Sequence, residues 1–97
     1  MTPSAHQDTF ARDHLPAASH WPLLLLDGPD TRYPDRLNAA VALLDAKVAE
    51  GLGESPALRS DDGVYSYREV LARVDHLAHI LTGPMGLVPG NRVLLRG

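Results

Sequence analysis

The sequence predicts an α/β fold, and three observations support this. Residues 66–82 have the pattern of a long amphipathic helix that begins with a capping box. An Asp-Asp-Gly turn just before it predicts a β-hairpin. Within residues 92–96, the three consecutive residues Val93 to Leu95 are apolar, which is typical of a strand covered on both faces. Such a strand needs neighbours that the 97 residues do not supply, so we expect an N-terminal piece of a larger protein.

The first third of the chain predicts a short helix followed by an extended arm. Asp8 is expected to cap a helix over residues 8–15, which ends before Pro16 because a proline disfavours helical geometry in the preceding residue. Residues 16–36 are expected to form the arm. The arm carries Trp21 and the run Leu23 to Leu26, and so much apolar surface predicts that it lies against a body, most of which we expect to be missing from these 97 residues.

The middle of the chain predicts a second helix and the hairpin. Asn38 is expected to cap a helix over residues 38–50, whose apolar stripe is Leu37, Val41, Leu44 and Val48. Gly51 and Gly53 are expected to end it. Strands are expected over 56–60 and 64–66, joined by Asp61-Asp62-Gly63, where glycine tolerates a positive φ.

The long helix has the strongest local signals. Ser66 and Glu69 form the capping box, and Gly83-Pro84 is expected to end the helix. The side chains expected on its buried face are Val70, Val74, Leu77 and Leu81. We therefore divide the chain into residues 1–37, a helix and an extended arm, and residues 38–97, the truncated start of an α/β subdomain.

Composition narrows the classes of partner. A net charge of −3 and a pI near 5.9 argue against nucleic acid, which basic surfaces bind. The chain has no cysteine, so disulfides and thiolate chemistry are excluded. No apolar run approaches the roughly 20 residues of a membrane span, and no targeting signal is present, so we expect a cytoplasmic protein without a membrane partner.

Few residues are candidates for chemistry. His76 and His79 lie three apart on the long helix, as metal ligands sometimes do, but exposed helix histidines explain them as well and no third ligand is evident. Asp61 and Asp62 could form an acid pair, although Asp-Asp-Gly between strands is typical of a turn. No phosphate-binding glycine loop follows a strand. We therefore predict no catalytic, cofactor-binding or metal-binding residue.

Several segments nevertheless resemble the N-terminal part of the adenylate-forming (AMP-binding) superfamily, which includes the acyl-CoA synthetases. They are Pro56-Ala57-Leu58, Asp62-Gly63-Val64-Tyr65-Ser66-Tyr67-Arg68-Glu69-Val70 and Gly86-Leu87-Val88-Pro89-Gly90-Asn91-Arg92-Val93-Leu94-Leu95. Three upstream segments resemble the 2-aminobenzoate–CoA and benzoate–CoA ligase branch. They are Thr9-Phe10-Ala11-Arg12-Asp13-His14-Leu15-Pro16, Trp21-Pro22 and Tyr33-Pro34-Asp35-Arg36-Leu37-Asn38.

The resemblance implies a parent enzyme of aromatic compound degradation that converts an aryl acid, ATP and CoA into acyl-CoA, AMP and pyrophosphate. ATP, Mg²⁺ and CoA would be its cofactors, and the family's catalytic motifs lie beyond residue 97. By resemblance this region supplies scaffold, and the chain alone should not exchange pyrophosphate with ATP. Asn91 departs from the family pattern, which commonly has Asp there, but both residues suit a turn.

Two functions follow as expectations. In the first, the chain is the scaffold of a ligase, its partner is the rest of the ligase chain, and the fragment alone is inactive. In the second, it is a stand-alone interaction module that uses an exposed strand edge and an apolar face. We also expect the isolated chain to self-associate through residues 92–96 or the leucine run, or by swapping elements between copies.

Overall fold

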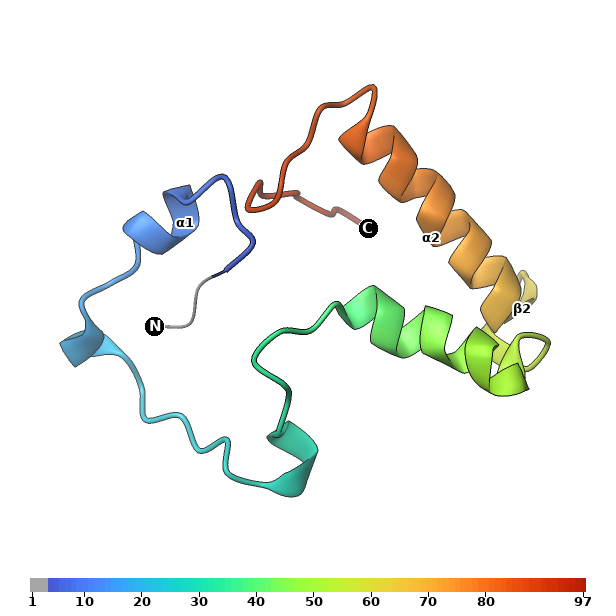
Figure 1. Ribbon diagram of the computed structural model, residues 1–97, viewed down its shortest axis with the longest axis horizontal. Coiled ribbons are helices and arrows are strands. Elements are labelled where there is room, and N and C mark those ends of the chain that lie inside the picture. Colours follow the sequence, from blue (N-terminus) through green and yellow to red (C-terminus); the bar gives the residue numbers. More distant parts are fainter. Residues whose placement is uncertain (1–3) are drawn as a thin grey trace.

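The computed structural model describes residues 4–97, which contain three helical regions and one two-stranded antiparallel hairpin (Figure 1). The regular elements are helix α1 (Phe10–Asp13), strand β1 (Pro56–Ser60), strand β2 (Gly63–Ser66) and helix α2 (Tyr67–Thr82). Two 3-10 turns, η1 (Ala18–His20) and η2 (Pro29–Thr31), interrupt the arm. The middle helix contains two π-helical segments, η3 (Val41–Asp45) and η4 (Val48–Leu52).

The hairpin forms where the sequence predicts it. Leu58 pairs with Tyr65, Arg59 with Val64 and Ser60 with Gly63, and the register shifts between Pro56 and Leu58. Gly63 has a φ of 137°, a conformation that L side chains rarely adopt. The predicted turn at Asp61-Asp62-Gly63 is therefore confirmed.

Helix α2 and its capping box are also confirmed. The Ser66 hydroxyl accepts a hydrogen bond from the Glu69 amide at 3.2 Å, and the Glu69 carboxylate accepts one from the Ser66 amide at 3.0 Å. After Thr82 the chain leaves the helix at Gly83, and the Leu87 amide bonds back to the Leu81 carbonyl at 2.9 Å. The helix thus has defined bonds at both ends.

The middle helix is joined to the start of α2. The side-chain oxygen of Asn38 accepts the Val41 amide at 3.2 Å, as a capping residue should. Gly51, with a φ of 89°, departs from helical geometry inside η4, near the end of the helix. The Arg68 amide donates to the Gly53 carbonyl at 2.9 Å. Helix α2 consequently packs against η3, η4 and both strands.

Two predictions of secondary structure are wrong. Residues 92–96 form no strand, because residues 4–97 contain no further strand for them to pair with, and Leu94 is 92% exposed. The first helix spans Phe10–Asp13 rather than 8–15, and Thr9 rather than Asp8 occupies the N-cap position. A helix this short gains few hydrogen bonds against a costly nucleation step.

The described residues share no hydrophobic core. None of their apolar side chains is buried; on α2, Val70, Val74 and Leu81 are only half-buried and Leu77 is 55% exposed, so the predicted buried face is wrong. The arm is exposed within the described residues, with Leu23 at 85%, so its packing against a body that lies mostly outside these residues stays a prediction.

The radius of gyration and the surface area agree with the absence of a hydrophobic core in the described residues. The radius of gyration is 17.1 Å, whereas a compact chain of this length has about 12–13 Å. The surface area is 8482 Å², against about 5,400 Å² for a compact monomer of this mass.

The predicted division at residues 1–37 and 38–97 stays a prediction, and residues 1–3 lie outside the described ones.

Candidate functional site

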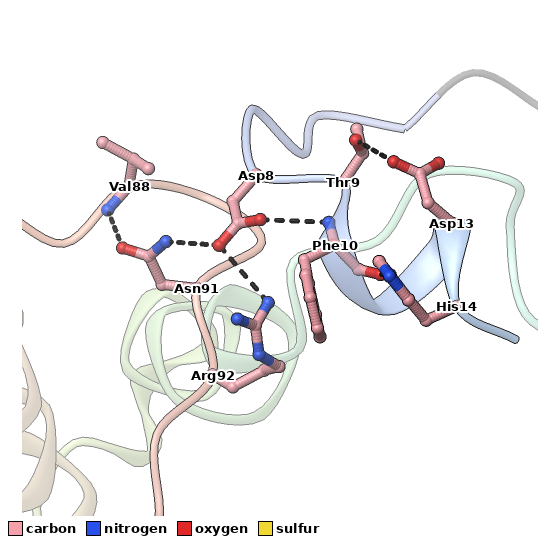
Figure 2. A network of polar contacts seen from close by, with 8 residues as sticks. All are labelled: Asp8, Thr9, Phe10, Asp13, His14, Val88, Asn91 and Arg92. Carbon is pink, nitrogen blue, oxygen red and sulfur yellow. Dashed lines mark hydrogen bonds and ion pairs between the residues drawn. The ribbon is translucent and has the colours of Figure 1, made fainter.

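The most organised polar site joins the two ends of the chain. Figure 2 shows Asp8 beside Val88, Asn91 and Arg92, which follow α2. We call the contacts of Gln7, Asp8 and Phe10 with Pro89, Asn91 and Arg92 the clasp. These are the first and last parts of the described chain, so the clasp closes the open ring seen in Figure 1.

A tight turn at residues 88–91 forms one half of the clasp. The Asn91 amide donates to the Val88 carbonyl at 3.1 Å, and the Val88 amide donates to the Asn91 side-chain oxygen at 2.9 Å. Gly90 has a φ of 97°. A Cβ at Gly90 would also overlap the carbonyl oxygen of Asp8, so this position needs glycine for two independent reasons.

The other half of the clasp is the backbone and side chain of the N-terminal segment. The amides of Gln7 and Asp8 both donate to the Pro89 carbonyl, at 2.8 and 3.0 Å. One carboxylate oxygen of Asp8 accepts from the Asn91 side-chain amide at 2.8 Å and from the Arg92 guanidinium at 3.3 Å. Its other oxygen accepts the Phe10 amide at 3.0 Å, so Asp8 links the clasp to the start of α1.

Aromatic contacts complete the clasp. The Arg92 guanidinium lies 4.4 Å from the centre of the Phe10 ring, within range of a cation–π interaction. The Phe10 ring stacks on His14 with a centroid distance of 4.0 Å, and the His14 ring nitrogen lies 2.7 Å from the Phe10 carbonyl. Arg92 therefore contacts both the Asp8 carboxylate and the Phe10 ring.

The clasp favours the ionised form of Asp8. The Phe10 amide lowers the pKa of the Asp8 carboxyl below its ordinary value of 3.8, and the Asn91 amide and the Arg92 charge lower it further, while desolvation acts in the opposite direction. Both carboxylate oxygens accept hydrogen bonds. This arrangement suits fastening of two segments better than proton transfer or nucleophilic attack.

A second, more apolar groove lies between the hairpin and α2. The Arg73 guanidinium lies 4.7 Å from the centre of the Tyr65 ring. The apolar side chains that line this groove are Leu58, Val70, Val74 and Leu77. Ser60 and Asp62 line it as well, at the turn end of the hairpin.

The candidate residues from the sequence, two histidines and two aspartates, do not form one site. His76 and His79 are exposed on α2, and Asp61 and Asp62 occupy the hairpin turn. Within residues 4–97, no group of three or more histidine, aspartate or glutamate side chains could hold a metal ion. The clasp itself was not predicted, because Asp8 and Asn91 each carried only a local signal, as a helix cap and as a turn residue.

Comparison with known proteins gives one distant similarity. The chain is 34% identical over 67 residues to a benzoate–CoA ligase of Thauera aromatica, an adenylate-forming enzyme; the match covers 69% of this chain. It takes up only 13% of that ligase, so the chain spans a small part of the relative's length. No protein-family model matches the chain, and no solved structure matches it significantly. The chain thus has a distant, partial similarity to an adenylate-forming ligase.

Among the helices of residues 4–97, none combines the length and apolar character needed to cross a bilayer.

Proposed function

We propose that the chain is the N-terminal scaffold of an ATP-dependent aryl acid–CoA ligase acting on benzoate, 2-aminobenzoate or a similar acid. The observation that carries this proposal is the 34% identity over 67 residues to a benzoate–CoA ligase. The parent reaction would convert acid, ATP and CoA into acyl-CoA, AMP and pyrophosphate. The residues of this chain would have a structural role, and the reaction would take place elsewhere in the protein.

The exposed apolar surface supports a scaffold role. About 3,000 Å² more surface is exposed than on a compact monomer of this mass, and α2 and the leucine run contribute to it. Exposed large apolar side chains that lie together on a surface mark places that other protein covers. We propose that the rest of the ligase chain is the partner that covers them.

The described residues do not themselves fit ATP or Mg²⁺. The N-terminus of α2, the longest helix, is the natural place for a phosphate. Its amides are partly occupied by the capping box of Ser66 and Glu69, which also puts a carboxylate there. ATP, Mg²⁺ and CoA are therefore proposed as cofactors of the parent enzyme, and no step is assigned to residues 4–97.

Pyrophosphate exchange tests the proposal. The protein encoded by the complete reading frame and the 97-residue chain would each receive ATP, Mg²⁺ and either benzoate or 2-aminobenzoate. We expect exchange, and acyl-CoA formation with CoA, from the complete protein and none from the 97-residue chain. Exchange by the short chain alone, or a stop codon directly after Gly97, would overturn the scaffold role.

The second candidate is a stand-alone interaction module. Leu94 and Leu95 are 92% and 89% exposed, and they favour this candidate because an exposed apolar segment can dock on a partner. A stop codon after Gly97 combined with recovery of a stoichiometric partner from the native cell would support it.

A further inference from the structure

Only the clasp ties the N-terminal segment, residues 7–14, to the second half of the described chain. Every hydrogen bond and ion pair that joins residues 4–37 to residues 38–97 ends on Pro89, Asn91 or Arg92. Neither α1 nor the turns η1 and η2 pack against another helix or strand. The position of the segment therefore depends on a few contacts at one turn.

The two halves of the clasp are connected by a long tether, residues 16–37, and then by the middle helix, the hairpin and α2. Residues 16–37 run through the two 3-10 turns with almost every side chain exposed, and Figure 1 shows them looping away from α2. A flexible tether holds its ends at an effective concentration of roughly 1 mM.

We infer that the clasp is an exchangeable docking site whose partner is a second copy of this chain. The segment around Asp8 of one copy would bind the turn at residues 88–91 of another. The two halves are complementary in charge, since a carboxylate faces a guanidinium and an amide, and two backbone N–H groups face one carbonyl. Exchange between copies forms the same contacts that the closed monomer forms.

Concentration decides which form dominates. Because the tether supplies roughly 1 mM, a clasp that closes within one chain must also close between chains at that concentration. Far below it, the natural chain stays closed on itself. Blocking the contact within each chain, while leaving it possible between chains, should therefore convert monomers into dimers.

A charge swap achieves this blocking. In an Asp8→Arg chain the introduced guanidinium faces Arg92, and in an Arg92→Asp chain the introduced carboxylate faces Asp8, so like charges oppose closure within either chain. Mixed at about 1 mM in total, the chains can exchange segments and pair opposite charges at both clasps. We expect the mixture to contain a dimer that neither chain forms alone, beyond any association through the apolar surface that both chains share.

Two controls separate this exchange from association through apolar surfaces. Asp8→Arg/Arg92→Asp in one chain restores opposite charges within that chain and should remain monomeric. In the second control, an Arg96→Asp chain takes the place of the Arg92→Asp chain. It carries the same charge change at a residue outside the clasp, and it should not form the dimer with the Asp8→Arg chain.

Amide hydrogen exchange reports on the clasp directly and does not depend on sedimentation. With the Arg92→Asp chain isotopically labelled, its Gln7 and Asp8 amides should exchange several-fold more slowly in the mixture than alone. A mixture that stays monomeric, with unchanged exchange at these two amides, would overturn the inference. Because α2 and the hairpin do not contact the clasp residues of the N-terminal segment, their exchange should be the same in all chains.

Discussion

The hairpin with α2 and the N-terminal segment with its clasp are held in different ways. In the hairpin and α2, bonded residues are close in sequence: Ser66 and Glu69 are three apart, and β1 and β2 are joined by a two-residue turn. In the clasp, Asp8 and Asn91 are 83 residues apart. Local contacts close small loops at low entropic cost, whereas the clasp must close a long one.

The difference also appears in how many contacts support each region. Helix α2 contacts both strands and both π-helical segments, so loss of one contact leaves others. The N-terminal segment is held by one turn. We therefore expect changes in the turn to release the segment without disturbing α2, and changes at the helix cap to do the reverse.

The largest effect is expected from Gly90→Ala. The added Cβ would overlap the Asp8 carbonyl and the backbone would keep an unfavourable positive φ. Strain of this kind costs about 1–3 kcal/mol. The Gln7 and Asp8 amides should lose protection from hydrogen exchange, and the α2 amides should keep theirs.

Gly86→Ala is the matched control. Gly86 also has a positive φ, of 66°, but nothing lies within 4 Å of the Cβ that would be added. It should strain the chain after α2 and leave the Asp8 contacts in place. Equal loss of protection at Gln7 in both variants would contradict the assigned overlap with Asp8.

A smaller effect, confined to the other region, is expected from Ser66→Ala. Loss of the hydroxyl that accepts the Glu69 amide should cost about 1 kcal/mol of helix stability. Circular dichroism should show reduced helicity and a lower melting temperature. Ser66→Asn should retain most of both, because asparagine caps helices about as well as serine. If Ser66→Ala opened the clasp instead, the proposed independence of the two regions would be wrong.

Sequence reasoning succeeded where a few neighbouring residues decide the structure. The capping box, the Gly63 turn and the Asn38 cap each depend on residues within about four positions, and the structure confirms all three. The strand at residues 92–96 failed because an apolar run becomes a strand only beside a pairing strand, and residues 4–97 provide none there. Local patterns thus fixed local structure only.

The clasp could not be predicted for a related reason. Asp8 and Asn91 each had a sufficient local explanation, so neither pointed to the other. The one available signal was that Asn91 stands where the adenylate-forming enzymes that the chain resembles commonly have Asp. Its side-chain oxygen bonds the turn at Val88, and its NH₂ group remains free to donate to Asp8. An aspartate at this position would instead set two carboxylates against each other.

The smallest effect, and the most specific to the clasp, should come from lowering the pH. The pKa of the folded Asp8 carboxyl lies below 3.8, chiefly because of the Phe10 amide and then Asn91 and Arg92. The ionised clasp therefore adds stability that is fully present above pH 3.8 and is lost as the pH falls through the lower folded pKa.

An NMR titration of the Asp8 carboxyl, followed together with the Gln7 and Phe10 amides, measures this effect. All three signals should change with one midpoint below pH 3.8. In an Asp8→Asn chain the two amides should lack that transition, since no charge remains to be neutralised. A midpoint at or above 3.8 for Asp8 would mean that the clasp is open in solution. The N-terminal segment would then lack its only described attachment, whereas α2 and the hairpin, held by contacts close in sequence, should be unaffected.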